Sequence, residues 1–213
     1  MTQDAATVVL VDDDPSIRDA VRRLLQSVGL RVDVFESVQA LAGRGLPKGP
    51  ACLVLDVRLP GQNGLDFQAA LAKARVPLPV IFITGHGDIP MSVRAMKAGA
   101  VEFLTKPFRD QDLLDAILLA VERDRTRLQA DAGLADLRSR AAELTAREFE
   151  VMRGVASGLA NKQIANELGL SEITVKAHRG QVMRKMNARS IADLVRMADK
   201  LTARLGKPRD DQR

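Results

Sequence analysis

The chain has 213 residues, of which 28% are charged and 46% hydrophobic, and its formal net charge is +5 at pH 7. This length suits one large or two small domains, and the composition excludes collagen-like, low-complexity and disordered proteins. No apolar run approaches the roughly 18 residues of a membrane span, and the N-terminus lacks the segments of a signal peptide. Cys52, the single cysteine, allows no internal disulfide, and its apolar neighbours predict a buried, inert thiol. We therefore expect a soluble cytoplasmic protein.

Charge is distributed unevenly along the chain. Residues 1–123 contain 14 basic and 15 acidic residues, whereas residues 124–213 contain 18 basic and 12 acidic residues. The basic second part suggests contact with a polyanion, although a basic solvated surface would give the same counts. Phe149 is the only aromatic residue after residue 123. This disfavours single-strand recognition by base stacking and favours binding to a duplex.

The first 123 residues alternate β-rich runs with amphipathic helical stretches. The expected strands are Thr7–Val11, Arg31–Phe35, Ala51–Leu55, Pro79–Ile83 and Val101–Leu104. The expected helices between them are Pro15–Val28, Ser37–Ala42, Gly64–Ala74 and Pro90–Ala98. This order predicts a parallel five-stranded sheet with helices on both faces, and such sheets bind ligands at the carboxyl ends of their strands.

Chemically active side chains stand at those strand ends. Asp12 and Asp13 follow the first strand, Asp56 the third, Thr84 the fourth and Lys106 the fifth. Three adjacent carboxylates repel one another unless a cation lies among them, and hard oxygen ligands favour Mg²⁺. Lysine and threonine suit phosphate oxygens, and an aspartate in such a site can form an aspartyl-phosphate. Each residue alone is unremarkable, but their joint placement predicts a site for phosphoryl chemistry.

The residues at the strand ends are inconsistent with two classes of enzyme. A dinucleotide-binding domain needs a glycine-rich turn after its first strand, but residues 12–15 read DDDP, which would repel a pyrophosphate. An aspartyl-nucleophile phosphatase of the haloacid dehalogenase kind has a second aspartate two residues after the first, where this chain has Arg58. Neither class is therefore expected.

Four segments resemble a known family: VDD at residues 11–13, VLDVRLPG at 54–61, ITGHG at 83–87 and FLTKPF at 103–108. Together they resemble the receiver domain of two-component response regulators. The resemblance implies that Asp56 is the phosphoacceptor, with Lys106 and Thr84 as its catalytic partners. It also implies that Thr84 and Phe103 form a switch pair, and that Lys106–Pro107 is a cis peptide that orients the lysine.

The same resemblance implies a magnesium site. Asp13, Asp56 and the carbonyl of Arg58 would bind Mg²⁺ directly. Asp12 would act largely through a water molecule on the metal. All four residues lie in the segments that carry the resemblance.

The second half of the chain is predicted to be helical. Gln111–Leu137 is expected to be a last helix of the first domain that runs on as an exposed linker, because residues 122–127 are almost all charged. Gly133 is a candidate break in this helix, and whether the linker pairs as a coiled coil is left open. Further helices are expected at Ala146–Ser157, Lys162–Leu168, Ile173–Met186 and Ile191–Leu201.

Capping signals and a short turn organise these helices. Thr145 and Glu148 form a capping box, and Ser171 is expected to cap the third helix. Residues 169–171 join the second and third helices as in a helix-turn-helix.

Helical-wheel positions divide the third helix into two faces. We assign Val175, Val182 and Met186 to the core. The far face mixes donors with small residues, which suits the major groove of DNA, although a solvent-exposed helix shows the same pattern. That face comprises Lys176, Ala177, Gly180, Gln181 and Arg184. Arg179 lies nearer to the core edge, which favours a packing or phosphate-contact role.

Residues 144–197 resemble the LuxR-type four-helix DNA-binding domain through LTxRE, VAxGxxNKxIAxxL and SxxTVKxH. The resemblance places two side chains at base-reading positions and three near phosphates: Lys176 and Ala177, and Asn161, Lys162 and Thr174. The paired domains resemble the FixJ branch of these regulators. They predict a flavodoxin-like α/β receiver over residues 5–123, a helical linker over 124–141, an all-α helix-turn-helix domain over 142–203 and a disordered tail over 204–213.

The expected function is that of a phosphorylation-controlled transcription regulator, which is no enzyme beyond its own phosphorylation and dephosphorylation. A histidine kinase would donate the phosphoryl group, and phosphorylation would favour a homodimer that binds a double-stranded operator with two half-sites. RNA polymerase is an expected partner, and a membrane is not. The alternative is a module that signals through protein contacts alone. The basic residues of the third helix disfavour it.

Overall fold

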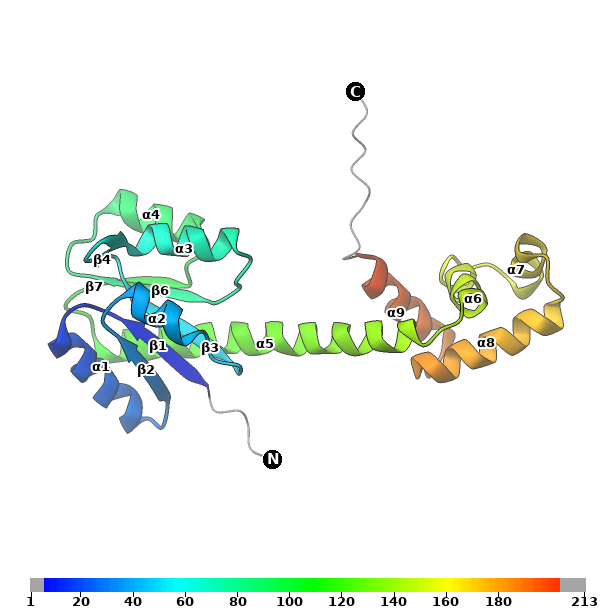
Figure 1. The fold of residues 1–213 in the computed structure, drawn as a ribbon, viewed down its shortest axis with the longest axis horizontal. Helices are drawn as coiled ribbons and strands as arrows, with labels where there is room; N and C mark the ends of the chain where they lie inside the picture. The colour runs from blue at the N-terminus through cyan, green and yellow to red at the C-terminus, as the bar shows by residue number, and fades with distance from the viewer. Residues whose placement is uncertain (1–5, 204–213) are drawn as a thin grey trace, which may run out of the picture. The chain divides into compact units, whose positions relative to one another are not determined.

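The computed structural model describes residues 6–203, which divide between Leu128 and Gln129 into two compact units. The expected tail at residues 204–213 lies outside the described residues. Each unit has its own hydrophobic core. One helix, α5, begins in the first unit and ends in the second (Figure 1).

The first unit contains a parallel sheet of five strands in the order β2-β1-β3-β6-β7. These strands are β1 (Thr7–Val11), β2 (Arg31–Phe35), β3 (Ala51–Asp56), β6 (Val80–Thr84) and β7 (Glu102–Thr105). The order confirms the expected fold class. The fourth strand starts one residue later than predicted, since Pro79 has no N–H and takes part only as an acceptor, from the N–H of Leu53 at 2.9 Å. A short antiparallel pair, β4 (Arg58–Leu59) with β5 (Gln62–Asn63), follows β3 and was not predicted.

In the first unit, each helix before α5 starts directly after a residue whose side chain caps it. The helices of this unit are α1 (Pro15–Ser27), α2 (Val38–Arg44), α3 (Gly64–Lys73), α4 (Ile89–Lys97) and the first part of α5 (Asp110–Ala142). Asp14 caps α1 through the N–H of Ser16, and Pro15 occupies the first helical position, where its missing N–H costs nothing. Asp88 accepts from the N–H of Met91 at 2.7 Å and caps α4. The cap explains why α4 begins one residue before the predicted start.

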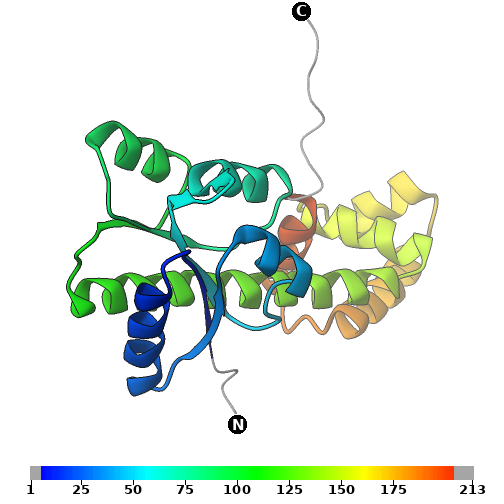
Figure 2. The same cartoon turned by 60° about the vertical axis from the view of Figure 1, so that its left-hand side comes forward.

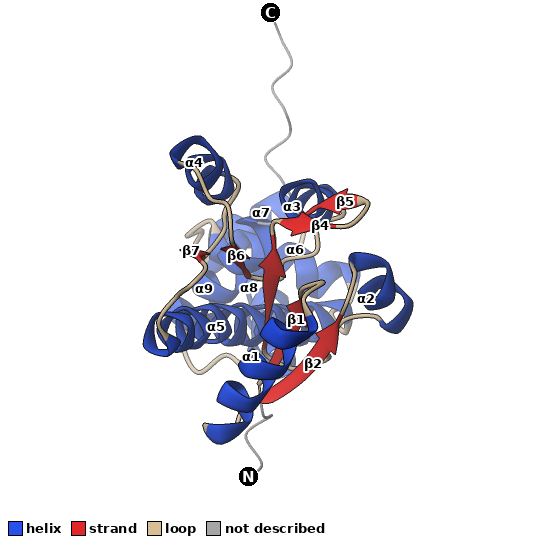
Figure 3. Ribbon diagram, turned by 90° about the vertical axis from the view of Figure 1, so that its left-hand side faces the viewer, coloured by secondary structure: helices blue, strands red, loops and turns tan. Residues whose placement is uncertain are grey.

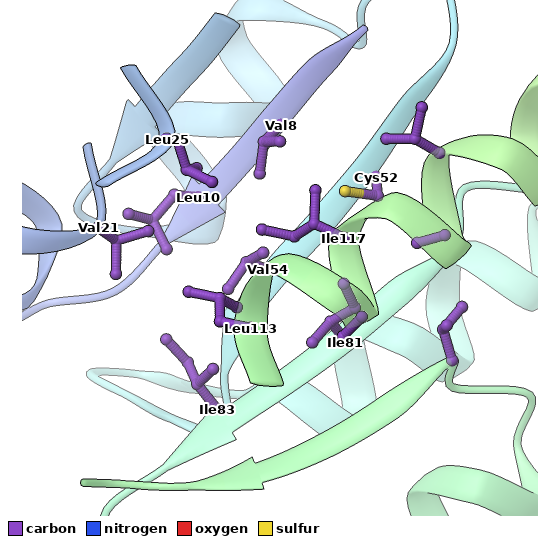
Figure 4. Close-up of a cluster of buried hydrophobic side chains, with 14 of the residues drawn as sticks. Val8, Leu10, Val21, Leu25, Cys52, Val54, Ile81, Ile83, Leu113 and Ile117 are labelled. Carbon is purple, nitrogen blue, oxygen red and sulfur yellow. The ribbon is translucent and has the colours of Figure 1, made fainter. Parts of the chain in front are cut away.

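The two faces of the sheet are covered by different helices (Figure 3). Because successive side chains of a strand point to opposite faces, Val8 and Leu10 pack with α1 and α5, whereas Val9 and Val11 pack with α2, α3 and α4. Figure 4 shows the first of these clusters, in which Leu113 and Ile117 of α5 lie over β3 and β6. Cys52 is fully buried there, and burial raises the pKa of its thiol to about 12. The predicted burial of Cys52 is thus confirmed.

Helix α5 differs from its prediction in three ways (Figure 2). It ends at Ala142 rather than at Leu137. Gly133 does not interrupt it: a helical glycine costs about 1 kcal/mol relative to alanine, and Leu134 and Leu137 more than offset this by packing into the core of the second unit. Within the charged run, Asp124 is buried rather than solvated. Its side chain accepts a hydrogen bond from the N–H of Ala51, the first residue of β3, at 2.9 Å.

The second unit is helical and follows the predicted boundaries to within two residues. Its helices, after the end of α5, are α6 (Ala146–Ala156), α7 (Asn161–Leu168), α8 (Glu172–Met186) and α9 (Ile191–Ala203). The capping box of Thr145 with Glu148 is present. Gly169 ends α7 in the left-handed conformation (φ 65°), which glycine adopts without a steric penalty, and Ser171 caps α8. The expected helix-turn-helix is therefore formed by α7 and α8.

No helix within residues 6–203 is both long enough and apolar enough to cross a membrane.

Candidate functional site

Three carboxylates meet at the carboxyl end of the sheet. Asp12 and Asp13 follow β1, Asp56 ends β3, and one carboxylate oxygen of each lies within 4.8 Å of the others. Asp12 and Asp56 are buried, whereas Asp13 is exposed. Parallel strands bring their carboxyl ends to one edge, which is why residues 43 positions apart in the sequence become neighbours. A set of hard oxygen ligands with one exposed member suits a small hard cation such as Mg²⁺.

Lys106 joins two of these carboxylates. Its Nζ donates to Asp12 Oδ2 at 2.6 Å and to Asp56 Oδ2 at 2.7 Å. The backbone N–H of Lys106 donates to the carbonyl of Thr84 at 2.7 Å, and the peptide bond to Pro107 is cis, as predicted. The ammonium group is therefore held in place both by its charge and by the backbone that carries it.

Burial and charge oppose each other at this cluster. Burial raises the pKa of Asp12, although the hydrogen bond from Lys106 and the N–H of Asp14 work in the opposite direction. Burial would lower the pKa of Lys106, but its hydrogen bonds to Asp12 and Asp56 raise the pKa above its ordinary value. Lys106 therefore stays protonated, as a partner for phosphate oxygens must.

Backbone groups bind the remaining oxygens of the two buried carboxylates. The N–H of Arg58 donates to Asp56 Oδ1, and the N–H of Asp14 donates to Asp12 Oδ1, each at 2.9 Å. Arg18, which the sequence analysis did not single out, donates through Nη1 to the carbonyl oxygens of Asp12 and Asp13 at 2.8 Å. It lies in the first turns of α1, and only its closeness in sequence could have indicated this role.

A glycine beside the central aspartate was also missed. A Cβ on Gly64 would lie 2.5 Å from the carbonyl oxygen of Asp56, and the N–H of Gly64 donates to the carbonyl of Val57 at 2.8 Å. A side chain at this position would therefore displace the backbone of Asp56 itself.

The expected switch residues lie on neighbouring strands. The Thr84 side chain is buried and accepts from the N–H of His86 at 3.3 Å. Phe103 on β7 is opposite Phe82 on β6, with ring centroids 6.2 Å apart. A Cβ on Gly87 would lie 2.9 Å from the Phe103 ring and 3.2 Å from the Thr84 methyl group. Gly87, in the loop after β6, therefore lies so close to both expected switch residues that a side chain there would overlap them.

The second unit contains the predicted DNA-facing residues, and the faces of α8 are as expected. Val175, Val182 and Met186 are fully buried. The far face is exposed at Lys176, Ala177, Gly180, Gln181 and Arg184. Within that face, Arg184 donates to the side chain of Gln181.

The three residues predicted near phosphates lie at the N-terminal ends of α7 and α8. Asn161 and Lys162 are the first two residues of α7, and Lys162 is exposed. Thr174 lies in the first turn of α8, where its hydroxyl is 2.8 Å from that of Ser171. Arg179, whose role the wheel left open, is half-buried, and its Nη1 donates to Asn161 Oδ1 at 2.9 Å.

Comparisons with known proteins agree with both halves. The family model of the response regulator receiver domain matches residues 8–118, and that of the bacterial regulatory proteins of the luxR family matches residues 142–198. Nodulation protein W of Bradyrhizobium diazoefficiens is 57% identical over 196 residues, which are 92% of this chain and 86% of that protein. Transcriptional regulatory protein FixJ of the same organism is 41% identical over 90% of this chain and 93% of its own length. The solved structure of the response regulator StyR is 46% identical, with a TM-score of 0.83, and covers 92% of this chain and 99% of that one.

These matches extend over both units, and the matched ranges include the site residues already described. The luxR match argues against the alternative of a module that does not bind DNA. The family consists of transcription factors rather than conventional enzymes. Its receiver domain accepts phosphoryl groups, which accords with the acidic cluster at the sheet edge. The chain therefore belongs to the two-component response regulators, as a transcription factor with a phospho-accepting receiver domain and a LuxR-type helix-turn-helix, similar to FixJ.

Proposed function

We propose that Asp56 accepts a phosphoryl group from a histidine kinase and that this event controls binding of the chain to duplex DNA. The observation that carries the proposal is the position of Lys106, whose ammonium is 2.7 Å from Asp56 Oδ2 in an acidic cluster of which Asp12 and Asp56 are buried. A carboxylate oxygen of Asp56 forms the new bond to phosphorus while the donor's own bond to phosphorus breaks, and the product is an acyl phosphate. Lys106 then pairs with an oxygen of the transferred group.

The residues at the cluster fit a Mg²⁺ ion. Three carboxylates within 4.8 Å of one another supply oxygen ligands, and their mutual repulsion exceeds what one lysine neutralises. We assign Asp13, Asp56 and the carbonyl of Arg58 as direct ligands and Asp12 as a ligand through water. Bound Mg²⁺ would supply positive charge against the phosphoryl oxygens.

Thr84 and Phe103 are proposed to transmit the change. Within residues 6–203, the Thr84 hydroxyl oxygen accepts one hydrogen bond, from the N–H of His86 at 3.3 Å, and its own hydrogen can be donated to a phosphoryl oxygen. Thr84 and Phe103 both lie so close to Gly87 that a Cβ there would overlap them, and we propose that a movement of the threonine is accompanied by a movement of the phenylalanine ring or of this loop.

For the DNA-binding domain, we propose that α8 enters the major groove. Lys176 and Ala177, with Gln181 and Arg184, face the bases, because they occupy the exposed side of a helix whose other side is fully buried. Asn161, Lys162 and Thr174 contact phosphates, because they cluster at helix N-termini whose first N–H groups lack partners within the helix.

The partners and boundaries follow from this assignment. We propose a receiver over residues 5–123, a helical linker over 124–141 and a DNA-binding domain over 142–203. Phosphorylation favours a homodimer that matches an operator with two half-sites, and the DNA-bound dimer contacts RNA polymerase. These partners place the protein in the cytoplasm.

A labelling experiment tests the phosphoacceptor. The native full-length chain, incubated with a small-molecule phosphodonor and Mg²⁺, is expected to take up one acyl phosphate that hydroxylamine releases. Asp56→Asn should abolish the label. Asp66→Asn, which changes an exposed aspartate in the first turn of α3, should label as the native chain does. Undiminished labelling of Asp56→Asn would reject Asp56 as the acceptor.

The metal assignment has its own test. Asp13→Ala removes an exposed carboxylate without disturbing the hydrogen bonds of Asp12 and Asp56, so the variant should fold but need much more Mg²⁺ for the same rate of labelling. An unchanged Mg²⁺ dependence would contradict the assignment.

A further inference from the structure

The hydrogen bond between Arg179 and Asn161 joins the two helices of the helix-turn-helix. Arg179 lies in the middle of α8 and is half-buried, while Asn161 is the first residue of α7. Arg179 Nη1 donates to Asn161 Oδ1 at 2.9 Å. By contrast, Lys176 and Arg184 on the same helix are exposed. Arg179 therefore points its guanidinium at α7, whereas the exposed Arg184 of the same helix does not.

This contact determines which way the Asn161 amide faces. An arginine side chain carries only donors, so it can meet only the oxygen of the amide and never its NH₂ group. The two N–H donors of Asn161 Nδ2 must then lie on the other side. Within residues 6–203 the Asn161 side chain makes no further hydrogen bond. Two oriented donors remain for an acceptor from outside the protein.

The surroundings of these donors favour an anionic acceptor. The next residue, Lys162, is exposed and positively charged. The N-cap of α7 is Ala160, which has no side chain to cap the first N–H groups of the helix. Arg179, Lys162 and the first N–H groups of α7 therefore all lie near Asn161, and all of them carry positive charge or N–H donors.

We infer that Arg179 is a positioning residue for DNA binding: it holds the Asn161 amide with its donors turned to a DNA phosphate, and it does not contact DNA itself. The inference rests on the proposed function, in which Asn161 lies at a phosphate. It adds the statement that the effect of Arg179 on affinity passes through Asn161. Without the arginine, the amide can rotate and present its oxygen, which a phosphate repels.

A double-mutant cycle tests this dependence. The native full-length chain, Arg179→Met, Asn161→Ala and the double variant are titrated with two duplexes over a series of salt concentrations. One duplex is selected by the native chain from a random library, and the other is a scrambled sequence of the same composition. Arg153→Met is the matched control, because it removes one exposed arginine from α6 of the same unit. Far-UV circular dichroism verifies that each variant is folded, and Arg179→Leu, which also lacks a donor, replaces Arg179→Met if the latter is not.

The expected result is a non-additive cycle. Each single substitution should weaken both duplexes by about three- to tenfold, the worth of one hydrogen bond, and the double variant should be no weaker than the weaker single. Arg179→Met should also shift the salt dependence by much less than the roughly 0.9 in slope that one lost ionic phosphate contact removes. Arg153→Met should change affinity less than twofold.

Two results would overturn the inference. In the first, the effects multiply in the double variant and the salt slope falls by the full amount, which would mean that Arg179 itself contacts a phosphate. In the second, Asn161→Ala binds both duplexes as the native chain does. Failure of the proposed function is a different outcome, since the native chain would then bind neither duplex and select none.

Discussion

Replacing the buried Asp124 should destabilise the first unit, because this residue of α5 is hydrogen-bonded to β3, the central strand of the sheet. Asp124 Oδ2 accepts from the N–H of Ala51 at 2.9 Å, and Oδ1 accepts from Arg127 at 2.8 Å. In Asp124→Ala the buried N–H of Ala51 loses its acceptor, which costs about 1–3 kcal/mol. The side chain of Arg127 is 31% exposed, so water reaches it and the lost ion pair adds only about 0–1 kcal/mol. We therefore expect a loss of about 1–4 kcal/mol in the free energy of unfolding.

Urea unfolding followed by far-UV circular dichroism measures this loss, since the chain has no tryptophan or tyrosine to report by fluorescence. Amide hydrogen exchange assigns it, because protection should fall in peptides that contain Ala51–Asp56. Asp136→Ala is the control on the same helix: its carboxylate is 56% exposed and pairs with Arg140 one turn on, so its loss should cost less than about 0.5 kcal/mol. If Asp124→Ala proves no less stable than Asp136→Ala, the hydrogen bond to β3 does not stabilise the unit.

Two further predictions concern Gly64, beside Asp56, and Glu148, in the second unit. Gly64→Ala should slow phosphoryl labelling and lower stability by about 1–3 kcal/mol, because its Cβ would overlap the Asp56 carbonyl oxygen at 2.5 Å, whereas Gly43→Ala, with open space around its Cβ, should do neither. Equal labelling rates for the two variants would contradict this. The hydrogen bond from Lys185 lowers the pKa of Glu148 below its ordinary value of 4.5. The stability from this bond is therefore present above that value and is lost as pH falls through the lowered pKa. Urea midpoints of the second unit between pH 7 and pH 3 should fall more steeply for the native chain than for Glu148→Gln, and parallel curves would refute the linkage.

The elements that sequence reasoning located well are those with strong local signals. Alternating strands and helices, the proline after Asp14 and the capping box of Thr145 with Glu148 all act within a few residues, and the structure agrees with each. The continuity of α5 was not predictable in the same way. Gly133 is a local signal for a break, but its cost is outweighed by packing of Leu134 and Leu137 against helices that follow much later in the chain.

In the candidate site, too, some residues could be predicted from the sequence and others depend on the tertiary structure. The carboxyl ends of parallel strands indicate in advance that Asp12, Asp56 and Lys106 lie together. Arg18 and Gly64 were missed because their roles depend on backbone carbonyl positions, which no residue pattern encodes. The hydrogen bond between Asn161 and Arg179, likewise, depends on how α7 packs against α8, so a helical wheel of one helix cannot predict it.

The most direct test of the account is whether phosphorylation of Asp56 controls DNA binding. Affinity for a duplex with two half-sites, chosen from a random library by the phosphorylated chain, is measured for the native chain and Asp56→Asn, each with and without phosphodonor and Mg²⁺. We expect the phosphodonor to strengthen DNA binding by the native chain and to convert it to a dimer, as measured by analytical ultracentrifugation, while Asp56→Asn binds DNA weakly and stays monomeric under both conditions. Equal affinity of the native chain with and without phosphodonor, or the same increase in Asp56→Asn, would contradict this expectation.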